Sequence, residues 1–177
     1  MNEIIIHDKH FKPYISPEEI ALALKRMAAE ISFDFKGKNP LFIAVLNGSF
    51  VFAADLLRDL DFSCELSFVK LVSYLDTKST GEVKELIGLK EDIKDRHVVI
   101  VEDIVETGQT LALLKRKLSA CQPASVKIAT LLFKPYHFKE SFDIDYLGFE
   151  IPEAFIVGYG LDFNGHGRNL KGIYQIV

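Results

Sequence analysis

The sequence lacks the features that attach a chain to membranes or nucleic acids. Its 177 residues carry a net charge of -4, so no excess of lysine and arginine would attract an anionic surface or a phosphate backbone. The apolar run Ile4–Ile6 is too short for the core of a secretory signal, and no other run is long enough to span a bilayer. We therefore expect a cytoplasmic protein that contacts neither membrane nor nucleic acid.

Cysteine and histidine are also scarce, and their spacing excludes the common metal sites. The two cysteines, Cys64 and Cys121, lie in separate apolar stretches, which predicts two reduced and mostly buried thiols. The five histidines share no metal-ligand spacing, so we interpret all of them as structural or surface residues: His7, His10, His97, His137 and His166. Only His166 stays a minor candidate, because it lies near the site predicted below.

The residues that are present are typical of one compact domain. Hydrophobic residues make up 49% of the chain and charged residues 26%, a balance that argues against disorder. No internal repeat, low-complexity tract or linker interrupts the chain, so we expect residues 1–177 to form a single domain.

Predicted strands and helices alternate along the chain, which favours an α/β fold with a central, mainly parallel sheet flanked by helices. Ser16, Pro17 and Glu19 are typical of a capping box, and apolar residues then recur at helical spacing to about residue 32. Two further helices are predicted, one between Ser49 and Leu60 and one over Leu111–Leu118. We predict strands over Leu41–Leu46, Cys64–Tyr74, His97–Ile104 and Val126–Phe133, with short strands near Ala154–Gly158 and Gly172–Ile176. The polar segment Leu75–Glu85 has almost nothing to bury, which is typical of a lid loop.

The most informative segment is VVIVEDIVETGQTL, which runs from Val98 to Leu111. A buried strand ends in two carboxylates, Glu102 and Asp103, and a short turn then leads into a helix. Glycine allows close approach of the backbone, the helix start presents free N–H groups, and threonine hydroxyls add donors. This pattern predicts a phosphate cradle, although it is neither a P-loop nor a GxGxxG dinucleotide motif.

The two carboxylates narrow the choice of ligand. Acidic side chains beside a phosphate would repel it unless a hydrogen-bond donor or a cation lies between them. Ribose hydroxyls are such donors and Mg²⁺ is such a cation, so the pattern suits a ribose 5-phosphate better than a bare phosphate. A plainer interpretation is that Glu102 and Asp103 merely end a strand before an ordinary turn. The buried strand before them and the helix after them favour the phosphate site.

With these residues in place, the chain resembles the type I phosphoribosyltransferase family, and within it the hypoxanthine-guanine phosphoribosyltransferases most closely. The resemblance extends from Leu41 to Arg168. Besides the motif above, it rests on segments similar to the family's pyrophosphate loop, its mobile catalytic loop and its base-binding side: Ala44–Ser49, Val72–Tyr74 with Ser79–Glu82, Leu131–Lys134 and Gly148–Asp162. In this family the pyrophosphate loop contains a non-proline cis peptide, here expected at Leu46–Asn47.

The resemblance implies a fold with a small base-binding hood and a magnesium-dependent enzyme of purine salvage. Such an enzyme transfers the 5-phosphoribosyl group of phosphoribosyl pyrophosphate to hypoxanthine or guanine, giving IMP or GMP and pyrophosphate. It implies Glu106 as general base and ribose-phosphate binding by Glu102, Asp103, Glu106, Thr107, Gly108, Gln109 and Thr110. It implies pyrophosphate binding by Asn47, Gly48, Ser73, Tyr74 and Arg168, purine binding by Lys134, Phe155, Ile156 and Asp162, and Mg²⁺ ligation by Glu102, Asp103 and Asp162.

Single residues have plainer interpretations when taken by position alone. Lys134 would be a solvated lysine, Phe155 a core aromatic, Asp162 a turn cap and Arg168 an exposed cation. By resemblance, the Lys134 ammonium donates to the purine O6 and so selects a carbonyl over the amino group of adenine. Two positions depart from the family pattern. Glu106 stands where aspartate is usual, and Gln109 stands where lysine is frequent, which removes one positive charge from the phosphate loop.

Other functions stay open at this point. A regulator that binds phosphoribosyl pyrophosphate and controls RNA or DNA would need a basic face, which the net charge disfavours. A transferase that prefers xanthine is a closer alternative, because the sequence does not rank hypoxanthine, guanine and xanthine. Adenine, orotate and uracil rank lower. The family's members are commonly dimers or tetramers, so we expect a homo-oligomer.

Overall fold

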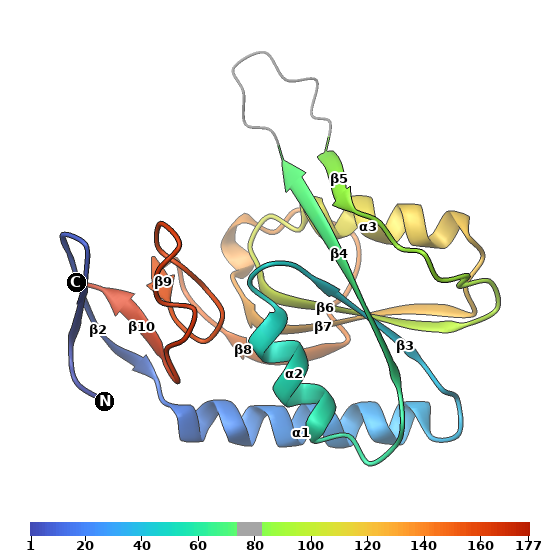
Figure 1. Cartoon of the computed structure of the whole chain (residues 1–177), viewed down its shortest axis with the longest axis horizontal. Helices are drawn as coiled ribbons and strands as arrows, with labels where there is room; N and C mark the ends of the chain where they lie inside the picture. The colour runs from blue at the N-terminus through green and yellow to red at the C-terminus, as the bar shows by residue number, and fades with distance from the viewer. Residues whose placement is uncertain (74–82) are drawn as a thin grey trace.

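The chain folds into two sheets of different character. The computed structural model describes residues 1–73 and 83–177 (Figure 1). The larger sheet has six strands in the order β5-β4-β3-β6-β7-β8, and the smaller has four in the order β1-β2-β10-β9. All strands of the larger sheet except β5 run parallel, which confirms the predicted α/β fold with a mainly parallel sheet.

The central strands agree with the sequence pattern to within about one residue at each end. The strands of the larger sheet are β3 (Leu41–Val45), β4 (Glu65–Ser73), β5 (Val83–Ile87), β6 (His97–Val105), β7 (Ser125–Phe133) and β8 (Tyr146–Glu150). β5 pairs antiparallel with β4. The predicted loop Leu75–Glu85 is therefore wrong for residues 83–85, and its remaining residues 75–82 lie outside the described part of the chain.

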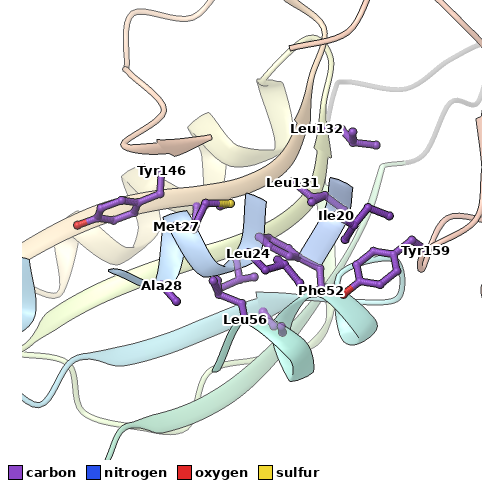
Figure 2. Close-up of a cluster of buried hydrophobic side chains, with 14 of the residues drawn as sticks. Ile20, Leu24, Met27, Ala28, Phe52, Leu56, Leu131, Leu132, Tyr146 and Tyr159 are labelled. Carbon is purple, nitrogen blue, oxygen red and sulfur yellow. The ribbon is translucent and has the colours of Figure 1, made fainter. Parts of the chain in front are cut away.

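Helices cover both faces of the larger sheet, so its central strands are apolar on both sides. α1 (Pro17–Phe35) and α2 (Phe50–Arg58) pack on one face, where the core includes Phe42 and Val99 (Figure 2). α3 (Gln109–Ala120) packs on the other, over Ile43 and Ile100. Adjacent residues of β3 and β6 thus enter opposite cores, as the period of two in a strand requires. The predicted capping box is confirmed: the Glu19 carboxylate accepts from the Ser16 amide at 2.8 Å, and Glu19 N donates to Ser16 Oγ at 3.2 Å.

The smaller sheet joins the two ends of the chain and is called the hood below, together with the loop 158–172. It contains β1 (Ile4–Ile6), β2 (Lys9–Ile15), β9 (Ile156–Val157) and β10 (Ile173–Ile176), and both termini lie at it (Figure 1). The sequence pattern predicted β9 and β10 but missed β1 and β2. β2 includes Pro13 and three basic or imidazole side chains, so its sequence does not read as a strand, and its pairing with β1 on one side and β10 on the other makes it one.

One expectation about the cysteines is wrong. Cys64 is half-buried and burial raises the pKa of its thiol, but Cys121 is exposed because it ends α3 at the surface. Both thiols are free. Within the described ranges, no helix has the length and apolar character needed to cross a membrane.

A partly buried polar cluster fixes the end of α1 against the far edge of the sheet. Tyr146 on β8 donates a hydrogen bond to Asp34 Oδ2 at 2.7 Å, and Lys127 on β7 donates to the same oxygen at 2.6 Å. The hydrogen bond from Lys127 contributes most to holding the pKa of Asp34 below its ordinary value, and the hydrogen bond from Tyr146 contributes next. The cluster therefore ties α1, β7 and β8 together through one carboxylate.

Replacing Tyr146 by phenylalanine should destabilise the protein by about 1–2 kcal/mol, because a hydrogen bond to a charged acceptor is lost. The matched control is Tyr136→Phe, since the Tyr136 side chain is exposed (79%). Unfolding in urea monitored by circular dichroism measures both. Equal stability of the two variants would contradict this role of the cluster.

Candidate active site

Most of the predicted site residues lie on loops at the carboxyl ends of three neighbouring strands. β3 is followed by residues 46–49, β6 by residues 106–108, and β7 by Lys134. β3, β6 and β7 are parallel and adjacent, so these loops meet at one edge of the sheet. Ligands of open α/β sheets bind at this edge.

The loop after β6 has the form of the predicted anion cradle. Gly108 is the N-cap of α3 with a φ of 79°, and a Cβ atom there would lie 2.6 Å from the Phe138 ring. Since glycine has no side chain, Gly108 itself caps none of the first-turn N–H groups of α3. Thr107 Oγ1 accepts from the Gln109 amide at 3.4 Å. A cavity of about 230 Å³ opens here, lined by Glu102, Ile104, Val105, Glu106, Thr107, Gly108, Thr110 and Leu111.

The two carboxyls at the end of β6 are both withdrawn from water. Oε2 of Glu102 is buried and has no hydrogen-bond partner among the described residues, and Asp103 is 7% exposed. Burial, together with the neighbouring Asp103 charge, raises the pKa of Glu102 well above its ordinary value of 4.5. Burial also raises the pKa of Asp103, although hydrogen bonds and the Arg168 charge partly oppose the rise. Glu102 therefore stays protonated to a higher pH than Asp103 does.

The carboxyl pair fits a divalent cation. Two adjacent carboxyls, one with a buried and unpartnered oxygen, repel each other when both are ionised, and a cation between them removes that repulsion. In the described part of the chain, no cluster of three or more histidine, cysteine, aspartate or glutamate side chains forms a complete metal site. Mg²⁺ suits such an arrangement, because it is usually bound by one or two carboxylates and completes its shell with water and substrate phosphates.

The loop after β3 lies directly against this pair. The Leu46–Asn47 peptide is cis, as predicted. A Cβ atom on Gly48 would lie 1.5 Å from Asp103 Oδ2, so the Asp103 carboxylate occupies the space that any other residue would fill. From the other side, a Cβ atom on Gly160 of the hood would lie 2.2 Å from the Gly48 carbonyl oxygen. Three segments distant in sequence therefore converge at Gly48.

Lys134 is buried at the end of β7, so its interpretation as a solvated lysine is wrong. It is 6% exposed, and its ammonium forms an ion pair with the half-exposed Glu106 carboxylate. The Lys134 amide also donates to the Val105 carbonyl at 2.9 Å, which fixes the start of this loop to β6. The structure thus brings the predicted general base and the predicted O6 donor into contact.

The hood presents an aromatic ring with a free face. Phe155 is 47% exposed, and its ring packs edge-on against Phe163 with 5.6 Å between centroids. Its carbonyl accepts from the Ile176 amide at 2.9 Å, and Ile156 is buried in β9. An exposed, well-anchored ring is suited to stacking on a planar ligand.

Asp162 and Arg168 are bonded to each other within the hood. The Asp162 carboxylate forms an ion pair with Arg168 and accepts from the Gly165 amide at 2.7 Å. Arg168 also donates to the Gly160 carbonyl at 2.7 Å. Asp162 is therefore a turn cap in this structure, and its assignment as a metal ligand stays a prediction. His166 packs against the His7 ring at 4.6 Å between centroids, which supports its structural interpretation.

Two of the predicted site residues have no described contact within the site, and one residue next to the site was not predicted. Ser73 ends β4, and Tyr74 lies outside the described residues. The missed residue is Tyr159, which lies between the hood and α2. An aromatic residue flanked by Gly158 and Gly160 was the only signal in the sequence.

Comparison with known proteins places these features in a family. Residues 15–164 match the family model described as the phosphoribosyl transferase domain. The hypoxanthine-guanine phosphoribosyltransferase of Streptococcus pneumoniae is 42% identical over 163 residues, which cover 92% of this chain and 91% of that protein. The hypoxanthine-guanine-xanthine phosphoribosyltransferase of Tritrichomonas foetus is 39% identical over 98% of this chain and 95% of that protein. A crystal structure of a hypoxanthine-guanine phosphoribosyltransferase from Bacillus anthracis has a TM-score of 0.86 at 39% identity, covering 94% of this chain and 98% of that one.

Replacing Glu102 by glutamine should stabilise the metal-free protein at neutral and alkaline pH. Because the pKa of Glu102 is raised on folding, the folded state binds this proton more tightly than the unfolded state, so stability falls as pH rises above about 4.5. Glutamine removes this ionisation, so the difference in Tm between variant and wild type should grow from pH 5 to pH 8. Each kcal/mol corresponds to about 2–4 °C for a chain of this size.

Thermal unfolding across this pH range with a chelator present measures the effect. The control is Glu3→Gln, because Glu3 is exposed and no growth of the difference with pH is expected there. A Tm difference for Glu102→Gln that stayed constant with pH would contradict the raised pKa.

Proposed function

This chain belongs to the phosphoribosyltransferase family, and from that premise we propose that it is an enzyme of purine salvage. It transfers the 5-phosphoribosyl group of phosphoribosyl pyrophosphate to hypoxanthine or guanine, giving IMP or GMP and pyrophosphate. The observation that carries the proposal is the buried, unpartnered carboxyl of Glu102 beside the N-terminal cradle of α3. A ribose 5-phosphate supplies hydroxyl donors for the Glu102 carboxyl and a phosphate for the N-terminal cradle of α3.

The donor substrate lies along the edge of the sheet. Its 5′-phosphate binds at the start of α3, where Thr107, Gly108 and Thr110 line the cavity. Its ribose hydroxyls face Glu102 and Asp103. Its pyrophosphate lies at the Asn47–Gly48 loop, with the Arg168 guanidinium on the hood side, because a guanidinium binds phosphate oxygens in bidentate fashion.

The purine binds between the hood and the loop after β7. Phe155 stacks on the base, the buried Ile156 backbone faces its edge, and Lys134 donates to O6. O6 and N7 are neighbouring atoms on one edge of a 6-oxopurine. The contact between Lys134 and Glu106 supports this assignment, because the two side chains are close enough to address those two atoms together.

Proton transfer is assigned to Glu106. As purine nitrogen bonds to the ribosyl carbon and pyrophosphate leaves, Glu106 accepts the proton of N7 while Lys134 offsets negative charge on O6. Glutamate is one methylene longer than the family's usual aspartate. Its half-exposed side chain, which already reaches Lys134, has room to turn toward the base.

Mg²⁺ is proposed as the cofactor, held by Glu102 and Asp103 and by the substrate itself. When bound, it neutralises charge on the pyrophosphate leaving group. The third proposed ligand, Asp162, would first have to release Arg168.

The cellular setting follows the same proposal. We place the enzyme in the cytoplasm, as expected for a chain with two free thiols, and propose a homodimer or homotetramer. The net charge of -4 gives no support to a nucleic-acid regulator.

Incubation of the protein with phosphoribosyl pyrophosphate, Mg²⁺ and single bases, followed by measurement of pyrophosphate release and of the nucleotide formed, tests the function. Hypoxanthine and guanine should be converted. Adenine should give no product, because Lys134 offers only donors to the 6-position and adenine has an amino group there. Orotate and uracil should give none either, because a pyrimidine has no N7 to face Glu106. The panel includes xanthine, whose selective conversion would make the enzyme a xanthine transferase. No nucleotide from any base would overturn the proposal.

Replacing Lys134 by methionine should lower kcat/KM for hypoxanthine by about 10- to 100-fold, because a charge-assisted hydrogen bond of about 1.5–3 kcal/mol is lost. Steady-state kinetics with saturating phosphoribosyl pyrophosphate measure this. The matched control is Lys139→Met, an exposed lysine on the following segment, whose kinetics should equal those of the wild type. An unchanged kcat/KM in the Lys134 variant would remove this residue from the purine site.

A further inference from the structure

Tyr159 has an unusual backbone conformation that its surroundings must maintain. Gly158, Tyr159 and Gly160 have φ angles of 99°, 46° and 96°, three consecutive residues in the left-handed region. Glycine adopts such angles readily, but a bulky residue seldom does. Gly158 is required because a Cβ atom there would lie 2.4 Å from the Gly172 carbonyl. The Tyr159 amide donates to the Leu170 carbonyl at 3.2 Å, and the contacts of its side chain add to this support.

The side chain of Tyr159 joins the hood to α2. Its hydroxyl donates to Asp55 Oδ2 at 2.6 Å, and the residue is 7% exposed. Figure 2 shows the ring extending from the hood toward α2, at the edge of the core that includes Phe52 and Ile20. Burial, followed by the hydrogen bond to Asp55, raises the pKa of Tyr159, so the phenol stays a donor.

The two ends of this hydrogen bond belong to the two parts of the pyrophosphate site. Asp55 lies on α2, the helix that begins immediately after the Asn47–Gly48 loop. Tyr159 precedes Gly160, which packs on the Gly48 carbonyl and accepts a hydrogen bond from Arg168 at 2.7 Å. The Gly160 amide in turn donates to the Arg168 carbonyl at 3.0 Å. The bond therefore spans the interface across which Arg168 and the loop after β3 must meet.

The purine side of the hood has a separate anchor. β9 pairs with β10, where Ile156 lies opposite Gln175, and the Phe155 carbonyl accepts from the Ile176 amide at 2.9 Å. These backbone hydrogen bonds do not involve Tyr159. Loss of the Tyr159 hydroxyl should leave Phe155 in place while freeing the loop that carries Arg168.

We propose that Tyr159 is a positioning residue: its hydrogen bond to Asp55 holds the hood loop 158–168 against the Asn47–Gly48 loop and so sets the affinity for the pyrophosphate group, but not for the purine. The inference rests on the proposed function for the identity of the ligand. Tyr159 would touch neither substrate. The purine and the pyrophosphate group would be bound by two parts of the hood that are anchored independently.

The matched pair of variants is Tyr159→Phe and Tyr146→Phe. Both tyrosines are buried, and each donates to an aspartate at the surface of a helix, Asp55 at 2.6 Å and Asp34 at 2.7 Å. They differ in place, because Tyr146 lies on β8 and contacts α1. A purely structural role predicts the same result for both variants.

Binding of pyrophosphate in the presence of Mg²⁺, measured by calorimetry, needs no turnover. We expect Tyr159→Phe to raise its Kd by about tenfold, which corresponds to about 1.4 kcal/mol. Tyr146→Phe should leave this Kd within about twofold of the wild type. In the assay of nucleotide formation, Tyr159→Phe should raise KM for phosphoribosyl pyrophosphate to a similar degree and leave KM for hypoxanthine unchanged.

Asp55→Ala and the double variant test whether Tyr159 acts through Asp55. The single Asp55→Ala change should raise the Kd of pyrophosphate as Tyr159→Phe does, and the double variant should be no weaker than either, because both changes remove one interaction. If Tyr159→Phe fails to fold, Asp55→Ala takes its place in the calorimetric test, because the Asp55 side chain is partly exposed and its loss disturbs the core less.

The outcomes separate the two proposals. Wild-type protein that binds pyrophosphate but forms no nucleotide would overturn the proposed function and leave the calorimetric comparison decisive for Tyr159. An unchanged Kd in Tyr159→Phe, an equal rise in Tyr146→Phe, a parallel rise in KM for hypoxanthine, or wild-type protein that binds no pyrophosphate would each overturn the inference.

Discussion

The arrangement of the site depends on two adjacent carboxyls buried at the end of the central strand. Glu102 and Asp103 end a run of valine and isoleucine that is covered by helices on both faces, so Asp103 is buried and Oε2 of the partly buried Glu102 has no access to water. Two buried like charges repel, and the protein responds by retaining a proton on Glu102. Such an arrangement costs stability and is satisfied only by something from outside: a cation, hydroxyl donors, or both.

The elements around the pair are shaped by this constraint. Asp103 fills the space that a side chain at position 48 would need, and Gly108 begins α3 without a side-chain cap of its own. Arg168 approaches from the hood and lowers the cost of the Asp103 charge. Positive partial charge at the start of α3 and the positive side chain of Arg168 therefore lie on either side of a negative centre, an order that matches a sugar with phosphates at both ends.

The hood contributes to this order through two different kinds of contact. β9 is held by backbone hydrogen bonds to β10, so the position of Phe155 is set by the smaller sheet. The loop that carries Arg168 leaves this sheet and depends on packing between Gly160 and Gly48 and on the bond from Tyr159 to Asp55. The proposed purine and pyrophosphate sites thus share one short segment with two supports, one within the hood and one reaching the larger sheet.

The sequence by itself determined the features that are local. The capping box of α1, the strands β3, β6 and β7, and the strand-turn-helix with Glu102 and Asp103 follow from hydrophobic period and from residue types adjacent in the chain. Resemblance added residues whose chemistry is not evident from position. The tertiary structure decided what depends on distant partners: β2 shares a sheet with the other end of the chain because β10 pairs with it, and Lys134 is buried because its strand ends beside Glu106. Likewise Asp162 forms an ion pair with Arg168, and Tyr159 donates a hydrogen bond to Asp55, which lies 104 residues away in the chain. The partner of such a side chain is set by how the elements pack and not by its neighbours in the sequence.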